Sequence, residues 1–128
     1  MFVAMGNPTS YGLSLDQGST FRTQITWTNP DGTPINLTGY RVLFQLRPTA
    51  DTVLAAFTFD SAHLTTGQHI QSLDATGVIN VTLDDEVTAT LVAGVYAYDL
   101  LVESASGVRD KILYGTAQVR STVTRVTP

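Results

Sequence analysis

The chain has 128 residues, of which 43% are hydrophobic and 14% are charged, and it carries a net charge of −4 without any cysteine. A chain of this length fits one domain with an ordinary hydrophobic core. The absence of cysteine excludes disulfide bonds and thiolate metal sites. The acidic balance argues against nucleic acid as a primary partner, because phosphates select a basic surface.

We expect no export signal in the first residues. The opening "MFVAM" is apolar, but no basic residue precedes it and "GNP" interrupts it, so it is too short for the core of a signal peptide. No other apolar run is long enough to cross a membrane. We therefore expect synthesis in a cytoplasm without a signal peptide, and no membrane partner.

Alternating apolar and polar residues predict strands through the middle of the chain. The alternation is clearest over residues 20–28, 40–47 and 77–83, where every second side chain can face a core. Residues 52–59 favour a further strand, and the weakly patterned span 60–76 favours a loop with one irregular strand. The side chains expected in the core include those of Val42, Phe44, Leu46, Ile79, Val81 and Leu83.

A short helical turn is expected next. Asp84 can cap its first N–H groups, the acidic Asp85 and Glu86 suit its positive end, and Gly94 is expected to end it. Such a turn is typical of the corner where a sandwich passes from one sheet to the other, and there a tyrosine hydroxyl returns to an upstream backbone group. We expect Tyr96 to be that tyrosine, so Asp84, Gly94 and Tyr96 form the predicted structural corner.

Residues 93–119 predict a hairpin, in which two alternating strands flank the turn "SASG". Asp99 and Glu103 share one face of the first strand. We expect them to pair with Arg109 or Lys111 on the returning strand, since opposite charges across a ladder attract.

About seven such strands predict an all-β fold, namely a single immunoglobulin-like antiparallel β-sandwich with extended N- and C-terminal arms. In this fold Tyr98 takes the core position that a disulfide cysteine holds in antibody domains. The predicted division is an N-terminal arm over residues 1–12, the sandwich over 13–119 and a C-terminal arm over 120–128.

The sequence offers no pattern typical of catalysis. His63 and His69 have only Asp60 and Asp74 nearby as acids and lack a clear third metal ligand. No nucleophile motif, calcium loop or glycine-rich phosphate loop is present. We expect no catalytic residues, no cofactor and no metal, and therefore no enzyme.

The two ends carry the predicted binding residues. Both are apolar or threonine-rich, too short to fold alone and too apolar to be solvated tails. Such arms add strands to open sheet edges of neighbours, with fraying as the alternative. The basic residues after residue 104 fit either docking on an acidic neighbour, such as another copy, or chance. The predicted partner-binding residues are Phe2, Val3, Met5, Arg120, Val123, Arg125 and Val126.

The order of motifs resembles a family of small proteins and N-terminal modules from the structural gene clusters of tailed bacteriophages, among them baseplate upper and tail-fibre proteins. The motifs are "QG" before a strand ending in Trp27, "DGTP" with "LTGY", "GVINVTL", the acidic turn, "AGVYAYDL", "SG" and "GTAQV". They extend over about 100 of the 128 residues.

The resemblance implies an immunoglobulin-like virion protein that binds capsid, neck, baseplate or tail-fibre proteins, with no catalytic residues. The chain ends shortly after its last strand, without a fibre domain, so a decoration, cement or adaptor subunit is expected, present as a homo-oligomer or in many copies. Head and tail locations stay open. The alternative is a carbohydrate-binding adhesion module, for which Tyr11, Tyr40 and Tyr114 are the exposed aromatic candidates.

Overall fold

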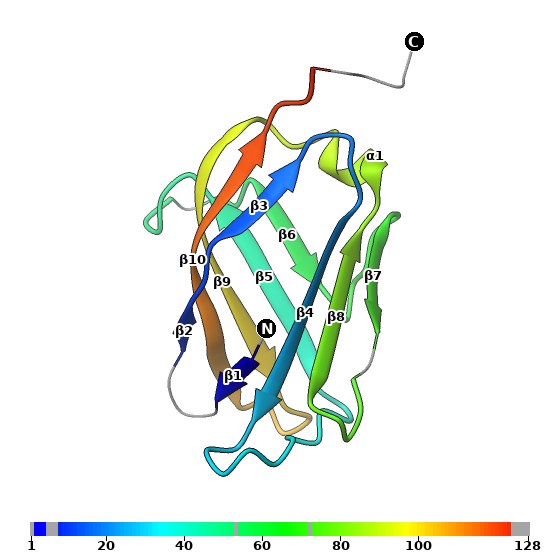
Figure 1. The fold of residues 1–128 in the computed structure, drawn as a ribbon, viewed down its shortest axis with the longest axis vertical. Coiled ribbons are helices and arrows are strands. Elements are labelled where there is room, and N and C mark those ends of the chain that lie inside the picture. Colours follow the sequence, from blue (N-terminus) through cyan, green and yellow to red (C-terminus); the bar gives the residue numbers. More distant parts are fainter. Residues whose placement is uncertain (1, 5–7, 53, 72, 124–128) are drawn as a thin grey trace.

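The computed structural model describes residues 2–4, 8–52, 54–71 and 73–123. They form two sheets that face each other and one short helix, which confirms the all-β expectation (Figure 1). In chain order the elements are β1 (Phe2–Ala4), β2 (Thr9–Ser10), β3 (Leu13–Asp16), β4 (Phe21–Thr28), β5 (Arg41–Arg47), β6 (Phe57–Asp60), β7 (Gln68–Gln71), β8 (Val78–Leu83), α1 (Asp85–Thr88), β9 (Gly94–Glu103) and β10 (Arg109–Arg120).

Each sheet combines strands from distant parts of the chain. One has the order β1-β4-β8-β7, and the other has the order β2-β10-β9-β5-β6, with β3 also paired with β10. The pairs among β4 to β10 are antiparallel, whereas β1, β2 and β3 each join a neighbour in parallel. The strands from β4 to β10 lie in regions where strands are predicted from the sequence, and β1 to β3 are additional.

The core lies between the two sheets. All six side chains that the alternation places there are buried, none more than 3% exposed, so the assignment of inner and outer faces is confirmed. Phe44 of β5 stacks on Phe59 of β6 with ring centroids 5.1 Å apart, and Trp27 of β4 meets the edge of Tyr40 at 6.1 Å. These aromatic contacts bury large apolar surfaces from both sheets in one continuous core.

The strand expected over residues 52–59 is shorter and starts later, since β6 begins at Phe57. The reason is its partner. Phe57 pairs with Leu46, and Pro48, which cannot donate a main-chain hydrogen bond, follows the end of β5. Ala56 lies opposite Arg47, the last residue of β5, so residues before 56 lie beyond the end of the strand with which they would pair.

Helix α1 follows β8 where the helical turn is expected. Asp84 is its N-cap residue, but the carboxylate makes no capping hydrogen bond and instead has Oδ2 3.1 Å from Nε2 of His69. The helix ends at Thr88, so the expectation that Gly94 ends it is wrong. Turn hydrogen bonds from Thr90 to Val87 and from Leu91 to Thr88 follow the helix, and Gly94 opens β9. The Tyr96 hydroxyl donates to the Val92 carbonyl oxygen at 2.5 Å, four residues upstream.

The outer face of the six-stranded sheet carries the predicted charge pairs. Arg109 Nε lies 2.5 Å from Glu103 Oε2, and Lys111 Nζ lies 3.4 Å from Asp99 Oδ2, which confirms the cross-strand pairing. Arg41 extends this network, because it binds Asp60 through two nitrogens and lies 3.6 Å from Glu103. The charges of β5, β6, β9 and β10 are thus largely neutralised across the sheet.

Candidate partner-binding groove

The N-terminal segment starts on one sheet and continues on the other. β1 pairs in parallel with the end of β4, in the register Phe2↔Thr26 to Ala4↔Thr28, whereas β2 and β3 both pair with β10. Among the described strands, nothing therefore pairs with the β1-side edge of β4 before Thr26. An exchange of sheets thus leaves part of an edge strand open.

Close backbone packing at Tyr11 fixes the path of β3. Tyr11 donates its N–H to the Tyr114 carbonyl oxygen at 2.9 Å, and its own carbonyl oxygen accepts the Tyr98 hydroxyl at 2.6 Å. Gly115 makes room for this approach, since a Cβ there would lie 2.6 Å from the Tyr11 oxygen. Tyr98 is 5% exposed, and burial raises the pKa of its hydroxyl. The hydroxyl therefore stays protonated as a donor to the N-terminal segment.

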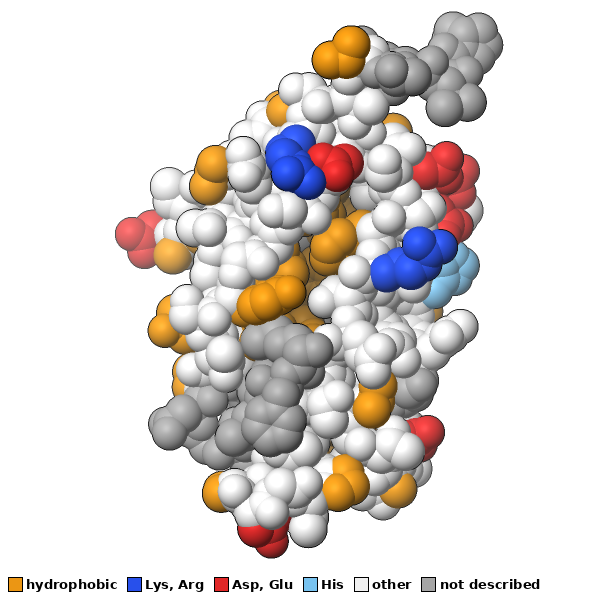
Figure 2. Space-filling view, viewed as in Figure 1, with side chains coloured by type: hydrophobic (Ala, Val, Ile, Leu, Met, Phe, Trp, Pro, Cys, Tyr) orange, Lys and Arg blue, Asp and Glu red, His pale blue; other side chains and the backbone are white. Residues whose placement is uncertain are grey.

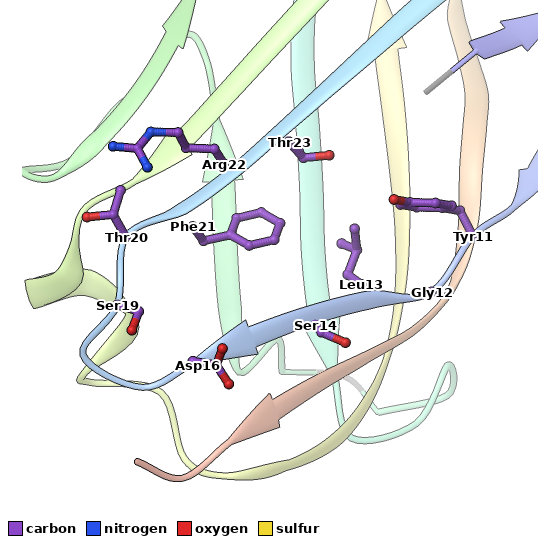
Figure 3. Close-up of a pocket in the computed structure, with 10 residues that line it drawn as sticks. All are labelled: Tyr11, Gly12, Leu13, Ser14, Asp16, Ser19, Thr20, Phe21, Arg22 and Thr23. Carbon is purple, nitrogen blue, oxygen red and sulfur yellow. The ribbon is translucent and has the colours of Figure 1, made fainter. Parts of the chain in front are cut away.

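β3 and β4 diverge from the turn that joins them (Figure 1), and a groove lies between them. It encloses about 410 Å³, and hydrophobic side chains are visible in the hollow on this face (Figure 2). Leu13 and the Phe21 ring lie on its inner side, whereas Arg22 points away from it (Figure 3). The lining residues are Tyr11, Gly12, Leu13, Ser14, Asp16, Ser19, Thr20, Phe21, Arg22 and Thr23.

The edge of β4 presents main-chain groups along this groove. Trp27 donates its N–H to the Gly77 carbonyl oxygen at 2.8 Å, in line with the β4–β8 register. Bonded and non-bonded residues alternate along an antiparallel ladder, so Phe21 and Thr23 direct their N–H and C=O groups to β8. Arg22, which lies between them, directs its N–H and C=O to the opposite edge, beside the groove.

The facing edge of β3 is open in the same way. Gln17 donates its N–H to the Arg120 carbonyl oxygen at 3.0 Å, and Tyr11 makes the equivalent bond to Tyr114. In β3 the odd-numbered residues therefore direct their N–H and C=O groups to β10, and Ser14 directs its N–H and C=O groups to the groove. Two strand edges, one from each sheet, thus border the same hollow.

Arg22 is the unneutralised charge of the groove. The guanidinium is exposed and has no carboxylate partner among the residues that the structure describes. Arg120, at the turn end of the groove, is bound by Asp16 through Nε at 2.7 Å and Nη2 at 3.0 Å. The free positive charge therefore lies on the β4 side.

The predicted partner-binding residues fall around this groove as far as they are described. Phe2 and Val3 belong to β1, at one end of the open edge, and Arg120 lies at the other end beside Asp16. Val123 follows Thr122, whose hydroxyl donates to the Gln17 carbonyl oxygen, and Val123 itself is 95% exposed. Three further predicted residues, Met5, Arg125 and Val126, lie outside the described residues.

The three tyrosines considered for carbohydrate do not form one platform. Tyr40 packs on Trp27, Tyr11 lines the groove, and Tyr114 lies on the outer face of β10 beside exposed Thr116. Stacking of a sugar ring needs aromatic faces on one surface, which these positions do not provide.

The histidines bind different carboxylates. His63 Nδ1 lies 3.1 Å from Asp60 and His69 Nε2 lies 3.1 Å from Asp84. Within residues 2–4, 8–52, 54–71 and 73–123, no three His, Asp or Glu side chains form a group suited to a metal ion. No helix in this part of the chain has the length and hydropathy needed to span a membrane.

The groove is not predicted from the sequence. The alternation of buried Leu13 and Leu15 with exposed Ser14 is the local signal that could have revealed β3. No protein-family model matches the chain, and no curated protein matches it.

Proposed function

We propose that the protein is a non-enzymatic structural subunit of a tailed-bacteriophage virion, a decoration, cement or adaptor protein that binds capsid, neck, baseplate or tail-fibre proteins through its ends. The virion setting is proposed from the family resemblance of the sequence. One observation supports binding through the ends of the chain: the described N-terminal and C-terminal segments both lie at the open groove. β1 lies at one end of the groove and Arg120 at the other.

An immunoglobulin-like fold is part of this proposal, and the strand order supports it. With β4, β8 and β7 as strands B, E and D, and β5, β9 and β10 as C, F and G, the strand order matches that of the BED and CFG strands of that fold. β1 lies where strand A would lie, but it pairs with β4 in parallel, whereas both sheets of that fold are antiparallel. The hydrogen bond from Tyr96 to Val92, at the start of strand F, corresponds to the tyrosine corner.

Binding by the ends suits a subunit of a symmetric particle. A short arm buries little surface, so each single contact is weak, but several contacts made at once raise the effective concentration of each one. The exposed Val123 is a suitable anchor, because burying one valine side chain stabilises a contact by about 1.5 kcal/mol. That energy corresponds to about a tenfold change in the affinity of one contact.

The proposal is tested by complementing a phage that lacks the chain and counting its copies in purified particles by quantitative mass spectrometry. Removal of residues 123–128 leaves the bonds of Arg120 and Thr122 in place, and Val123→Ser changes a single side chain. We expect the truncation to abolish incorporation and Val123→Ser to lower the copy number several-fold.

The matched control is Leu54→Ser, which changes another exposed apolar residue, 80% exposed, in the loop between β5 and β6. It should be incorporated at the normal copy number. Normal incorporation of the truncated chain would refute binding through the C-terminal arm. For the intact chain, hundreds of copies per particle would indicate the head, and six to a few dozen would indicate the tail.

A further inference from the structure

We propose that the open edge of β4 is the acceptor for one short, extended, acidic segment of a neighbouring protein, which adds a strand to the four-stranded sheet and places a carboxylate beside Arg22. This inference rests on the proposed function in one respect, that the occupant belongs to a neighbour in an assembly.

The main chain of the edge can bind a strand. Arg22 directs its N–H and C=O to the side on which β1 already pairs with β4, further along at Thr26 to Thr28. β1 therefore demonstrates within the chain that this edge receives an additional strand. Main-chain hydrogen bonds to an exposed sheet edge supply affinity in this mode of peptide recognition, and pockets for alternate side chains supply specificity.

The space available defines the length of the occupant. β1 pairs with this edge from Thr26 onward, and no described strand pairs with the same edge over residues 21–25. Five residues of a strand span about 16 Å. The occupant is therefore a segment of about five residues in extended conformation.

The two faces of β4 define the side-chain pattern of the occupant. Phe21 and Thr23 face the groove with Leu13, so residues of the added strand opposite them would bury apolar side chains in the hollow (Figure 3). Arg22 lies on the other face, so the residue opposite it would meet the guanidinium. An apolar–acidic–apolar alternation satisfies both faces.

The positive charge of Arg22 favours a segment of a different protein over an arm of another copy of this chain as the occupant. Residues 1–12 contain no charged side chain, and residues 121–128 contain Arg125 as their single charged side chain. Neither arm of a second copy thus carries an acidic side chain that could pair with Arg22. A segment of a different protein that carries Asp or Glu fits the site.

The inference is tested with the full chain, labelled with ¹⁵N, and the peptide acetyl-Val-Glu-Val-Thr-Val-amide at millimolar concentration. We expect shifts of the amide signals of Arg22 and Ser14, and a Kd about threefold lower than that of the peptide with Lys in place of Glu, as for a partly exposed ion pair. Arg22→Glu should reverse the preference between the two peptides.

A second pair of variants distinguishes the contribution of the main-chain hydrogen bond to peptide binding from that of the Arg22 charge. Arg22→Gln keeps the edge N–H and should bind both peptides equally. Arg22→Pro removes that N–H while leaving the β4–β8 ladder bonds, because Arg22 does not bond to β8, and it should abolish binding of both peptides. Thermal unfolding of each variant shows whether the fold is kept. If Arg22→Pro does not fold, the inference is tested by Arg22→Glu alone, which should reverse the preference between the Glu and Lys peptides.

The possible outcomes distinguish this inference from the proposed function. Absence of peptide binding, or equal binding of the Glu and Lys peptides by the unmodified chain, overturns the inference. Self-association that Arg22→Glu abolishes would identify a second copy as the occupant and also overturn it. Neither result bears on whether residues 123–128 are needed for incorporation, which tests the proposed function separately.

Discussion

At the scale of single residues, two buried polar groups at the end of β4 lack partners. Trp27 Nε1 and Thr28 Oγ1 make no hydrogen bond to any described residue. Both residues lie where β1 joins β4, in the pairs Val3↔Trp27 and Ala4↔Thr28. A buried donor or acceptor without a partner costs about 1–3 kcal/mol, so the junction that receives β1 is less stable than its burial suggests.

Thr28→Val should therefore raise the free energy of unfolding by about 1 kcal/mol, because it replaces an unbonded hydroxyl by a methyl group of the same shape. Thr88→Val is the matched control. The Thr88 hydroxyl is also buried but donates to the Ser19 carbonyl oxygen at 2.8 Å, so its loss should lower the free energy of unfolding by about 1–2 kcal/mol. Urea denaturation measures both values, and two variants with the same sign of effect would contradict the explanation.

At the scale of elements, the docking of β2 and β3 on β10 depends on Gly115. Gly115→Ala would place a Cβ 2.6 Å from the Tyr11 carbonyl oxygen, and backbone cannot yield as a flexible side chain can. We expect a loss of about 2–3 kcal/mol in the free energy of unfolding, and faster hydrogen exchange in β3. Gly12→Ala, where the nearest atom is 4.0 Å away, should change the free energy by less than about 0.5 kcal/mol. Equal effects of the two variants would exclude the close approach as the cause.

The same scale shows what the sequence can and cannot predict. β4, β5, β8 and the final hairpin have long alternating patterns, so their presence and core faces follow from local sequence. β1 to β3 have two to four residues each and pair with strands far along the chain, as Leu13 does with Ala117. So few residues carry little periodicity. β1 pairs with β4 from Thr26 onward, and this leaves the edge beside the groove open. The position of this pairing depends on two separate segments of the chain and on no local motif.

At the scale of the whole molecule, the ion-pair network on the six-stranded sheet makes stability depend on pH. Hydrogen bonds from Arg41 hold the pKa of Asp60 well below its usual range, and a hydrogen bond from Arg109 lowers the pKa of Glu103. A lowered pKa in the folded state means that the unfolded chain binds protons first. The stabilisation is therefore complete above the usual carboxyl pKa of about 4 and is lost as the pH falls below it.

Asp60→Asn should lower the free energy of unfolding by about 1–2 kcal/mol at pH 7, because Arg41 loses the carboxylate that it binds through two nitrogens. The difference from the unmodified chain should shrink between pH 5 and pH 2. Asp51→Asn is the control, since Asp51 lies in an exposed turn and has no bonded partner among the described residues. Denaturant unfolding at several pH values measures the slopes, and a difference that stays constant down to pH 2 would contradict the role of Asp60.

The parallel pairing of β3 with β10 also determines how the domain bears mechanical force. Tension applied between the two ends of the chain pulls β3 and β10 in opposite directions along their axes. The ladder from Leu13↔Ala117 to Asp16↔Arg120 is then loaded in shear, and its hydrogen bonds are strained together. Antiparallel terminal strands would instead unzip one bond at a time. The domain thus resists tension applied between its two ends.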